Sequence, residues 1–323
     1  MELLHMNRCT SPLVPSSAPS TFTPREDQTM HVPVSLENPD AVKYVGPKHF
    51  LDITCHQYDL LQKLETDRQV FKFQPVTEEQ FEYLSGDATR PSRFVKLQYH
   101  RPSQLLLAKV MPGWDHENIA AIFRRIVERQ LILMGVDSEC LSLASPRNEL
   151  GNWIKEPDLC WAPVVSSSKP TFVVEIGTSE SAAHLATDAH DWLEASHSPV
   201  HAVVTICFKY QSAESDSNPL TISIWRPGHE LTDIETRNHH FPAAKTSCVK
   251  IRNNSGSLSV SGFYLDPDSL LPVPTDEIRL PLEFFVGRQA SRSGEHDVVL
   301  DKEMLLGLLR QLWEYRRQRR TST

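Results

Sequence analysis

The sequence lacks any apolar segment that approaches the roughly 20 residues needed to span a bilayer, and its N-terminus lacks the apolar core of a secretory signal. We therefore expect a soluble intracellular protein, cytoplasmic or nuclear, with no membrane partner. A positive net charge is also lacking, since the formal charge is −8. Contact with nucleic acid would therefore need a local basic patch rather than a field over the whole surface.

Cysteine pairs and nucleotide-binding motifs are lacking too. None of the six cysteines stands in a CxxC pair, so their spacings fit no zinc module, and scattered single cysteines favour a reducing compartment. The absence of GxGxxG, GxxxxGK[ST] and GxSxG removes sequence support for a dinucleotide fold, a P-loop or a hydrolase elbow. The adjacent His239 and His240 have no third ligand at metal spacing.

Composition and hydrophobic pattern divide the chain into four parts. Residues 1–40 are rich in Ser, Thr and Pro, which is typical of a disordered tail. Residues 41–104 form an accessory region with a helix at LDITCHQYDLLQKLE and a strand at RFVKLQY. Between them, Thr77 and Gln80 have the spacing of a capping box that begins a second helix.

Residues 105–210 alternate strands and helices. Strands are expected at QLLLAKVMP, CLSLAS, WIKEPDLCWAP, TFVVEIG and VHAVVTICF. An amphipathic helix over 116–135 has one apolar face made of Ile119, Ile122, Phe123, Ile126 and Leu133. A second helix over 179–196 joins two apolar strands, which predicts a parallel βαβ crossover. The fold class is therefore α/β, with a mixed central sheet flanked by helices.

Residues 211–323 predict a β extension that ends in a helix. TISIWRPG and SLSVSGFYL indicate further strands, whereas residues 231–248 are typical of a long loop. The C-terminal helix is expected to pack on the core through Met304, Leu305, Leu308, Leu309, Leu312 and Trp313.

Two carboxylates interrupt or adjoin the apolar strands of this core. Asp158 follows Pro157, and Glu175 lies inside TFVVEIG. A buried carboxylate is costly unless a partner compensates its charge. Mg²⁺, with Mn²⁺ as a substitute, is one such partner because it prefers oxygen ligands. If the two strands are neighbours, a metal held by both carboxylates could activate water for phosphodiester hydrolysis.

The sequence around these residues resembles a known family. KEPD, PTFVVEIGTSES and LATDAHDWL together resemble the PD-(D/E)XK nuclease superfamily. More narrowly, with MPGWDHE at 111–117, they resemble a group of fungal proteins related to the bacterial Uma-type restriction-endonuclease-like proteins. The resemblance covers about residues 105–208. It implies a restriction-endonuclease-like core and metal-dependent hydrolysis of DNA.

Carried over residue by residue, the resemblance makes Asp158 and Glu175 the metal-binding carboxylates. An acidic residue of the first helix often completes such sites, and Glu117 is the first choice, followed by Glu128. The family's lysine stands two residues after the strand glutamate, where this chain has Gly177. Lys155 is the leading substitute, and Lys169 and Lys209 are weaker candidates.

A structural interpretation stands beside the catalytic one. Pro157–Asp158 is also an ordinary turn element, and Glu175 could hydrogen-bond to the serine-rich helix start. Without the motif lysine, the chain could be an inactive nuclease-like fold that binds nucleic acid or protein. Asp188 is expected to make a surface or capping contact.

Two arginine clusters also stand out. Arg124, Arg125 and Arg129 lie in the first core helix, and Arg316, Arg317, Arg319 and Arg320 lie near the end of the chain. The first cluster could contact phosphates or form a solvated helix face. The second could serve nuclear import or reflect the preference of helix C-termini for cations.

Overall fold

The computed structural model describes residues 40–322 except for positions 64, 67, 112, 166–168, 179–180, 196, 209–218, 229–241 and 255–256. The predicted disordered tail lies almost wholly outside the described residues. Lys209 and the pair His239–His240 also lie outside them.

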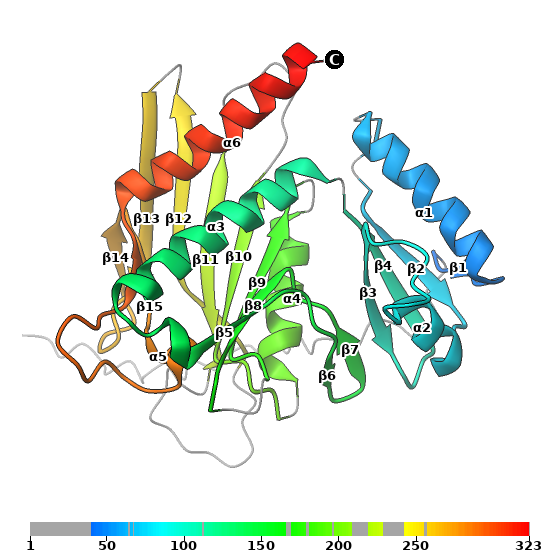
Figure 1. Ribbon diagram of the computed structural model, residues 1–323, viewed down its shortest axis with the longest axis horizontal. Helices are drawn as coiled ribbons and strands as arrows, with labels where there is room; N and C mark the ends of the chain where they lie inside the picture. The colour runs from blue at the N-terminus through cyan, green and yellow to red at the C-terminus, as the bar shows by residue number, and fades with distance from the viewer. Residues whose placement is uncertain are drawn as a thin grey trace, which may run out of the picture. The chain divides into compact units, whose positions relative to one another are not determined.

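The first part of the described chain forms a six-stranded sheet with two helices packed on it (Figure 1). In spatial order the strands are β1 (Val42–Lys43), β2 (Val70–Gln74), β4 (Leu105–Val110), β3 (Val95–His100), β7 (Trp153–Lys155) and β6 (Asn148–Leu150). The helices are α1 (Pro47–Gln62) and α2 (Glu78–Ser85). The capping box predicted at Thr77 and Gln80 begins α2 and is confirmed.

The second sheet has eight strands and carries the predicted core. In spatial order these are β14 (Pro272–Thr275), β13 (Ser257–Leu265), β12 (Ala244–Asn254), β11 (Leu220–Arg226), β10 (Ala202–Phe208), β9 (Phe172–Gly177), β8 (Leu159–Pro163) and β5 (Cys140–Leu143). β9 and β10 run parallel, joined by the helix α4 (Ala182–Glu194). The predicted βαβ crossover and the mixed α/β sheet are therefore confirmed.

Helices cover both faces of the eight-stranded sheet (Figure 1). One face packs against α3 (Trp114–Leu133) and α6 (Lys302–Ser322) through side chains such as Phe123, Val174 and Leu309. The other face packs against α4, where Trp192 lies against Val173. Alternating strand residues thus enter two separate cores, as the pleat of a β-strand requires.

Smaller elements complete the layer that contains α3 and α6. They are the 3-10 turn η1 (Asp137–Glu139), the short helix α5 (Glu283–Val286) and the two-stranded sheet of β15 (Ile278–Leu280) and β16 (Val298–Leu300). Among the described residues, no helix is both long and apolar enough to cross a bilayer.

The segment WIKEPDLCWAP, predicted as one strand, is two strands in different sheets. β7 ends at Lys155 and belongs to the six-stranded sheet, whereas β8 begins at Leu159 in the eight-stranded sheet. Pro157 has no N–H to donate to a ladder, which favours a break at this point. β4, at the start of the segment 105–210, likewise pairs with β2 and β3 in the six-stranded sheet.

The loop predicted over residues 231–248 is wrong at its C-terminal end, because β12 begins at Ala244. The polar residues at the start of β12 are typical of a loop. The strand forms because it pairs with both β11 and β13 and because its later residues Val249 and Ile251 are buried. Two predicted core residues are also exposed, Leu133 and Met304. The other packing residues named for α6 are buried as predicted.

Two glycines offer a matched test of this packing. A Cβ at Gly262 in β13 would overlap the carbonyl oxygen of Cys248 and lie 2.7 Å from the Cα of Val249. Gly262→Ala should therefore lower the free energy of unfolding by about 1–3 kcal/mol. A Cβ at Gly307 in α6 meets no heavy atom within 4 Å, so Gly307→Ala should raise it by up to about 1 kcal/mol. Urea denaturation followed by circular dichroism measures both, and equal effects would contradict the assigned β12–β13 pairing.

Candidate active site

Asp158 and Glu175 are brought together by the register of β8 and β9. These strands are antiparallel, with Leu159 opposite Val174, so the residue before Leu159 lies opposite the residue after Val174. The backbone N–H of Asp158 donates to the carbonyl oxygen of Val174 at 3.2 Å. Residues directly opposite in an antiparallel pair share a face of the sheet. The two predicted carboxylates therefore lie side by side.

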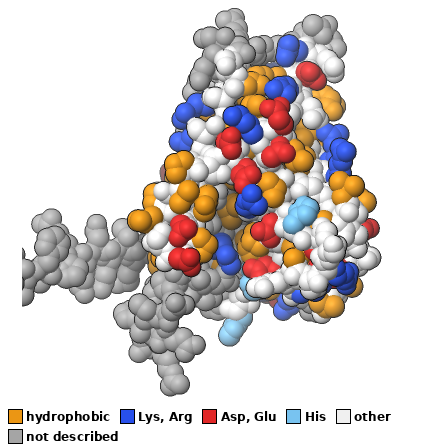
Figure 2. Space-filling view, turned by 90° about the vertical axis from the view of Figure 1, so that its left-hand side faces the viewer, with side chains coloured by type: hydrophobic (Ala, Val, Ile, Leu, Met, Phe, Trp, Pro, Cys, Tyr) orange, Lys and Arg blue, Asp and Glu red, His pale blue; other side chains and the backbone are white. Residues whose placement is uncertain are grey.

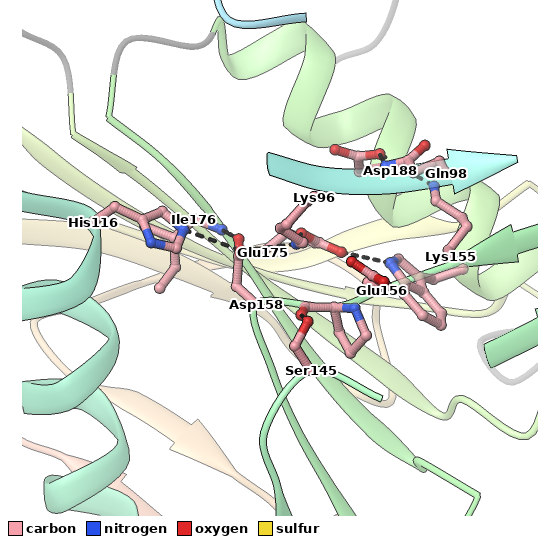
Figure 3. A network of polar contacts seen from close by, with 12 residues as sticks. Lys96, Gln98, His116, Ser145, Lys155, Glu156, Asp158, Glu175, Ile176 and Asp188 are labelled. Carbon is pink, nitrogen blue, oxygen red and sulfur yellow. Dashed lines mark hydrogen bonds and ion pairs between the residues drawn. The ribbon is translucent and has the colours of Figure 1, made fainter. Parts of the chain in front are cut away.

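A lysine from the other sheet binds both carboxylates (Figure 3). The Nζ of Lys96, in β3, lies 2.7 Å from Oδ1 of Asp158 and 3.0 Å from Oε2 of Glu175. Both carboxylate side chains are 1% exposed, and the lysine side chain is 10% exposed. One ammonium group thus compensates two buried negative charges.

Further groups from the backbone and from two helices contact the carboxylates. Oδ2 of Asp158 accepts the backbone N–H of Ile176 at 2.6 Å, and Nε2 of His116 lies 3.0 Å from Oδ1 of the same aspartate. Oε1 of Glu175 accepts the indole N–H of Trp192 at 2.7 Å. His116 comes from the first turn of α3, and Trp192 comes from α4, so both helices help to close the cluster.

The charges of the cluster are strongly coupled. Burial raises the pKa of Asp158, but Lys96 and His116 hold it well below its usual range. Burial raises the pKa of Glu175 to about 7. The Lys96 ammonium opposes this rise, and the Asp158 carboxylate adds to it. Burial lowers the pKa of Lys96, but the two carboxylates more than reverse this and leave it raised. The cluster therefore contains an ionised Asp158, a Glu175 that titrates near neutrality, and a protonated Lys96.

A second buried ionic cluster lies next to the first. Nζ of Lys155, in β7, lies 3.1 Å from Oδ1 of Asp188 and 2.9 Å from Oδ2 of Asp191, both on α4. The side-chain amide of Gln98, opposite Lys155 in the ladder, donates to the same Asp188 oxygen at 3.2 Å. Lys96 and Gln98 are two residues apart on β3 and so face the same side. One strand face thus serves both clusters.

Glu156 anchors the chain just before Asp158. Its carboxylate accepts two hydrogen bonds from the guanidinium of Arg90, each 2.9 Å long, and the backbone N–H of Leu97 lies 3.3 Å away. The bidentate geometry is the stronger form of a carboxylate–arginine contact. It fixes the strand break at Pro157 and thereby the position of Asp158.

The other predicted site residues do not reach the carboxylate pair. Lys155 is bonded to Asp188 and Asp191. The side chain of Glu117 is 73% exposed and contacts His116 at 3.7 Å rather than Asp158. Glu128 lies further along α3, and Lys169 is exposed before the start of β9. Gly177 ends β9 opposite Cys207. Their assigned roles stay predictions.

The interpretation of Asp188 as a surface or capping residue is wrong. Its carboxylate is buried, and burial, which raises its pKa, is outweighed by Lys155 and the neighbouring lysines, which lower it. The structural interpretation of Glu175 placed its partner at the serine-rich helix start. Among the described residues, the side chains that donate to its carboxylate are those of Trp192 and Lys96.

Sequence reasoning missed Lys96, His116 and Trp192. Lys96 alternates with apolar residues in RFVKLQY, which normally indicates a solvent-facing position. His116 lies within the motif MPGWDHE, so that motif did hold a signal for it. Within the described part of the chain, no group of three or more His, Cys, Asp and Glu side chains is arranged to hold a metal ion.

Removing the bridging cation should be costly. Lys96→Met would leave Asp158 and Glu175 buried without a compensating charge, so the free energy of unfolding should fall by about 3–5 kcal/mol at pH 8. Lys250→Met, which removes an exposed lysine from β12, is the matched control and should change it little. Urea denaturation of both variants measures the difference. Equal stability of the two variants would disprove the bridge.

The pKa of Glu175 predicts a specific pH dependence. Because folding raises this pKa from 4.5 to about 7, the proton on Glu175 contributes stability below pH 4.5. That contribution is lost as the pH rises through about 7. Over this window the wild type should lose about 1–3 kcal/mol of unfolding free energy relative to Glu175→Gln. Denaturation at several pH values tests this, with Glu79→Gln on the exposed face of α2 expected to track the wild type.

Comparisons with known proteins include a distant structural likeness. No protein-family model matches the chain, and no curated protein matches its sequence. A solved structure from Anabaena variabilis, described as a candidate nuclease belonging to DUF820, is similar over 73% of this chain and 99% of that chain. The identity is 15% and the TM-score is 0.37.

Proposed function

We propose that this protein is a metal-dependent nuclease of the PD-(D/E)XK type, within the fungal group that it resembles, and that it hydrolyses phosphodiester bonds in DNA. Asp158 and Glu175 would hold Mg²⁺, or Mn²⁺ in its place. The proposal joins the sequence pattern around these residues to the geometry of the site.

The observation that carries the proposal is the position of Lys96. Its Nζ lies within 3.0 Å of an oxygen of each carboxylate, so Asp158 and Glu175 converge on the space of a single cation. Had the two carboxylates diverged beyond the reach of one metal ion, the nuclease hypothesis would have failed.

The residues present fit Mg²⁺ in chemistry. Mg²⁺ prefers oxygen ligands and is often held by one or two carboxylates, while water and substrate phosphate complete its coordination. Asp158 and Glu175 supply that number of carboxylates from two adjacent strands. When bound there, the ion would supply Lewis-acid activation of water and charge stabilisation at the phosphate.

Lys96 has a clear role in this proposal. It replaces the lysine that the resemblance places at Gly177, and it comes from β3 rather than β9. An ammonium and a metal ion compete for the same carboxylate oxygens, so metal binding requires Lys96 to give up at least one of its two contacts. The released ammonium would then orient water and offset charge on the phosphate. His116, which contacts Asp158, is a positioning residue.

A specific observation favours one alternative. Each of the four carboxylate oxygens already has a protein partner, and both carboxylates are almost completely buried. In that alternative, Lys96 takes the place of the metal permanently, and the nuclease-like fold binds nucleic acid or protein without cutting.

DNA cleavage distinguishes the two functions. With Mg²⁺ or Mn²⁺, the purified full chain should cut plasmid and single-stranded DNA, and EDTA should stop the reaction. Asp158→Asn/Glu175→Gln should lower the rate at least about 100-fold, and Lys96→Met should do so as well because a positioned proton donor is worth that much.

Lys250→Met should cut like the wild type, and melting temperatures of all variants check that they are folded. Metal binding is followed separately by calorimetry. A folded wild type that neither binds Mg²⁺ or Mn²⁺ nor cuts DNA would establish the non-catalytic alternative.

A further inference from the structure

The two helices that cover one face of the eight-stranded sheet run antiparallel to one another. Arg125 of α3 donates to the side-chain oxygen of Gln311 on α6. Five residues further along α3, the amide nitrogen of Gln130 lies 3.8 Å from Sδ of Met304, which is earlier in α6. The beginning of α3 and the end of α6 are therefore at the same end of the pair, as Figure 1 shows.

The outer faces of these helices carry arginines. Arg125 and Arg129 are exposed and four residues apart on α3, so they lie on one face of the helix. Arg310 and Arg317, seven residues apart on α6, are likewise exposed and share a face. We call these four arginines the helix ridge.

Along α6, the positive charge of the sequence increases toward the C-terminal end, whereas the first turn of α3 at that end carries Asp115 and Glu117. From Arg310 to Arg320 the sequence contains five arginines and one acidic residue, Glu314, in a chain with a net charge of −8. At that end, α3 begins with the turn that contains His116, which lies 3.0 Å from Asp158. The start of α3 is therefore the part of the two helices that contacts the carboxylate pair.

The charge pattern elsewhere differs. On the face shown in Figure 2, acidic side chains are interspersed with lysines and arginines. Arg288 and Arg292, which lie outside the two helices, are each paired with Glu139 and Glu295. By contrast, Arg125 is bonded to a neutral glutamine, and the ion pair of Arg310 with Glu303 is long, at 3.9 Å.

The packing of the helices decides between two polyanionic partners. An anionic membrane surface binds helices that offer an apolar face for insertion. The apolar faces of α3 and α6 are already buried in the core, through residues such as Phe123, Leu308 and Leu312. The ridge instead offers arginines, and the same two helices carry the exposed aromatic side chains of Trp114 and Tyr315. Arginine with exposed aromatics suits phosphates and bases of nucleic acid.

We propose that the helix ridge of α3 and α6 binds the phosphate backbone of nucleic acid. This inference rests on the proposed function in one respect, because nucleic acid is also the proposed substrate. It assigns the binding surface to elements outside the carboxylate cluster and to residues that need no metal.

Binding is measured by fluorescence anisotropy of a labelled oligonucleotide, single-stranded and duplex, in EDTA so that no cleavage occurs. Arg125→Glu/Arg129→Glu and Arg310→Glu/Arg317→Glu should each weaken binding at least about tenfold. Each lost phosphate contact should also reduce the slope of log affinity against log salt by about one. All four arginines of the helix ridge are exposed, so the variants should remain folded, which melting temperatures verify.

The matched control is Lys250→Glu/Arg252→Glu. These exposed residues of β12 alternate with the buried Val249 and Ile251, so they lie on the face of the sheet opposite α6. The control should bind like the wild type. Equal weakening by the control, or unchanged binding by the ridge variants, would overturn the proposal. Binding of the wild type to phosphatidylserine vesicles but not to either oligonucleotide would overturn it in favour of a membrane.

Failure of the nuclease proposal is distinguishable from failure of this one. Asp158→Asn/Glu175→Gln should bind the oligonucleotides as tightly as the wild type in EDTA. A wild type that binds through the ridge but never cuts would reject the nuclease and keep the ridge. A wild type that cuts, with ridge variants that bind and cut equally well, would reject the ridge alone.

Discussion

The shared ammonium of Lys96 is the constraint on which the rest of the site depends. It contacts two carboxylates from adjacent strands of one sheet while belonging to a strand of the other. Two buried anions at this separation would repel each other strongly in a low-dielectric interior without it. Two further ion pairs lie nearby, Arg90–Glu156 and Lys155–Asp188. The second links β7 of the six-stranded sheet to α4, which covers the eight-stranded sheet.

The same constraint limits how a metal ion could enter. Every carboxylate oxygen of Asp158 and Glu175 has a protein donor. A metal ion bound there would repel the Lys96 ammonium, which is the donor with the most freedom to move because its stem is a flexible chain. The indole of Trp192 and the backbone N–H of Ile176 are held by the fold. A catalytic protein and a scaffold would thus differ in the mobility of a single side chain.

The prediction of the core was correct where a short stretch of sequence is enough to determine the local structure. TFVVEIG is almost wholly apolar, which predicts a central strand, and the helix after it predicts the parallel partner at β10. The capping box at Thr77 and the apolar stripe of α6 likewise depend on residues that are close together in the sequence. By contrast, β12 is polar enough to be typical of a loop. It is a strand because β11 and β13 lie on either side of it.

By itself, the sequence determined that Asp158 and Glu175 are unusual, because an acid beside Pro157 and an acid within an apolar strand both depart from the pattern around them. It could not identify the lysine. Lys155, three residues from Asp158 in the chain, is turned away to Asp188 because the strand breaks at Pro157. Lys96, more than sixty positions earlier, reaches the site because the two sheets meet there. Only the tertiary structure decides such a contact, since the position of a side chain from another sheet is set by packing rather than by local pattern.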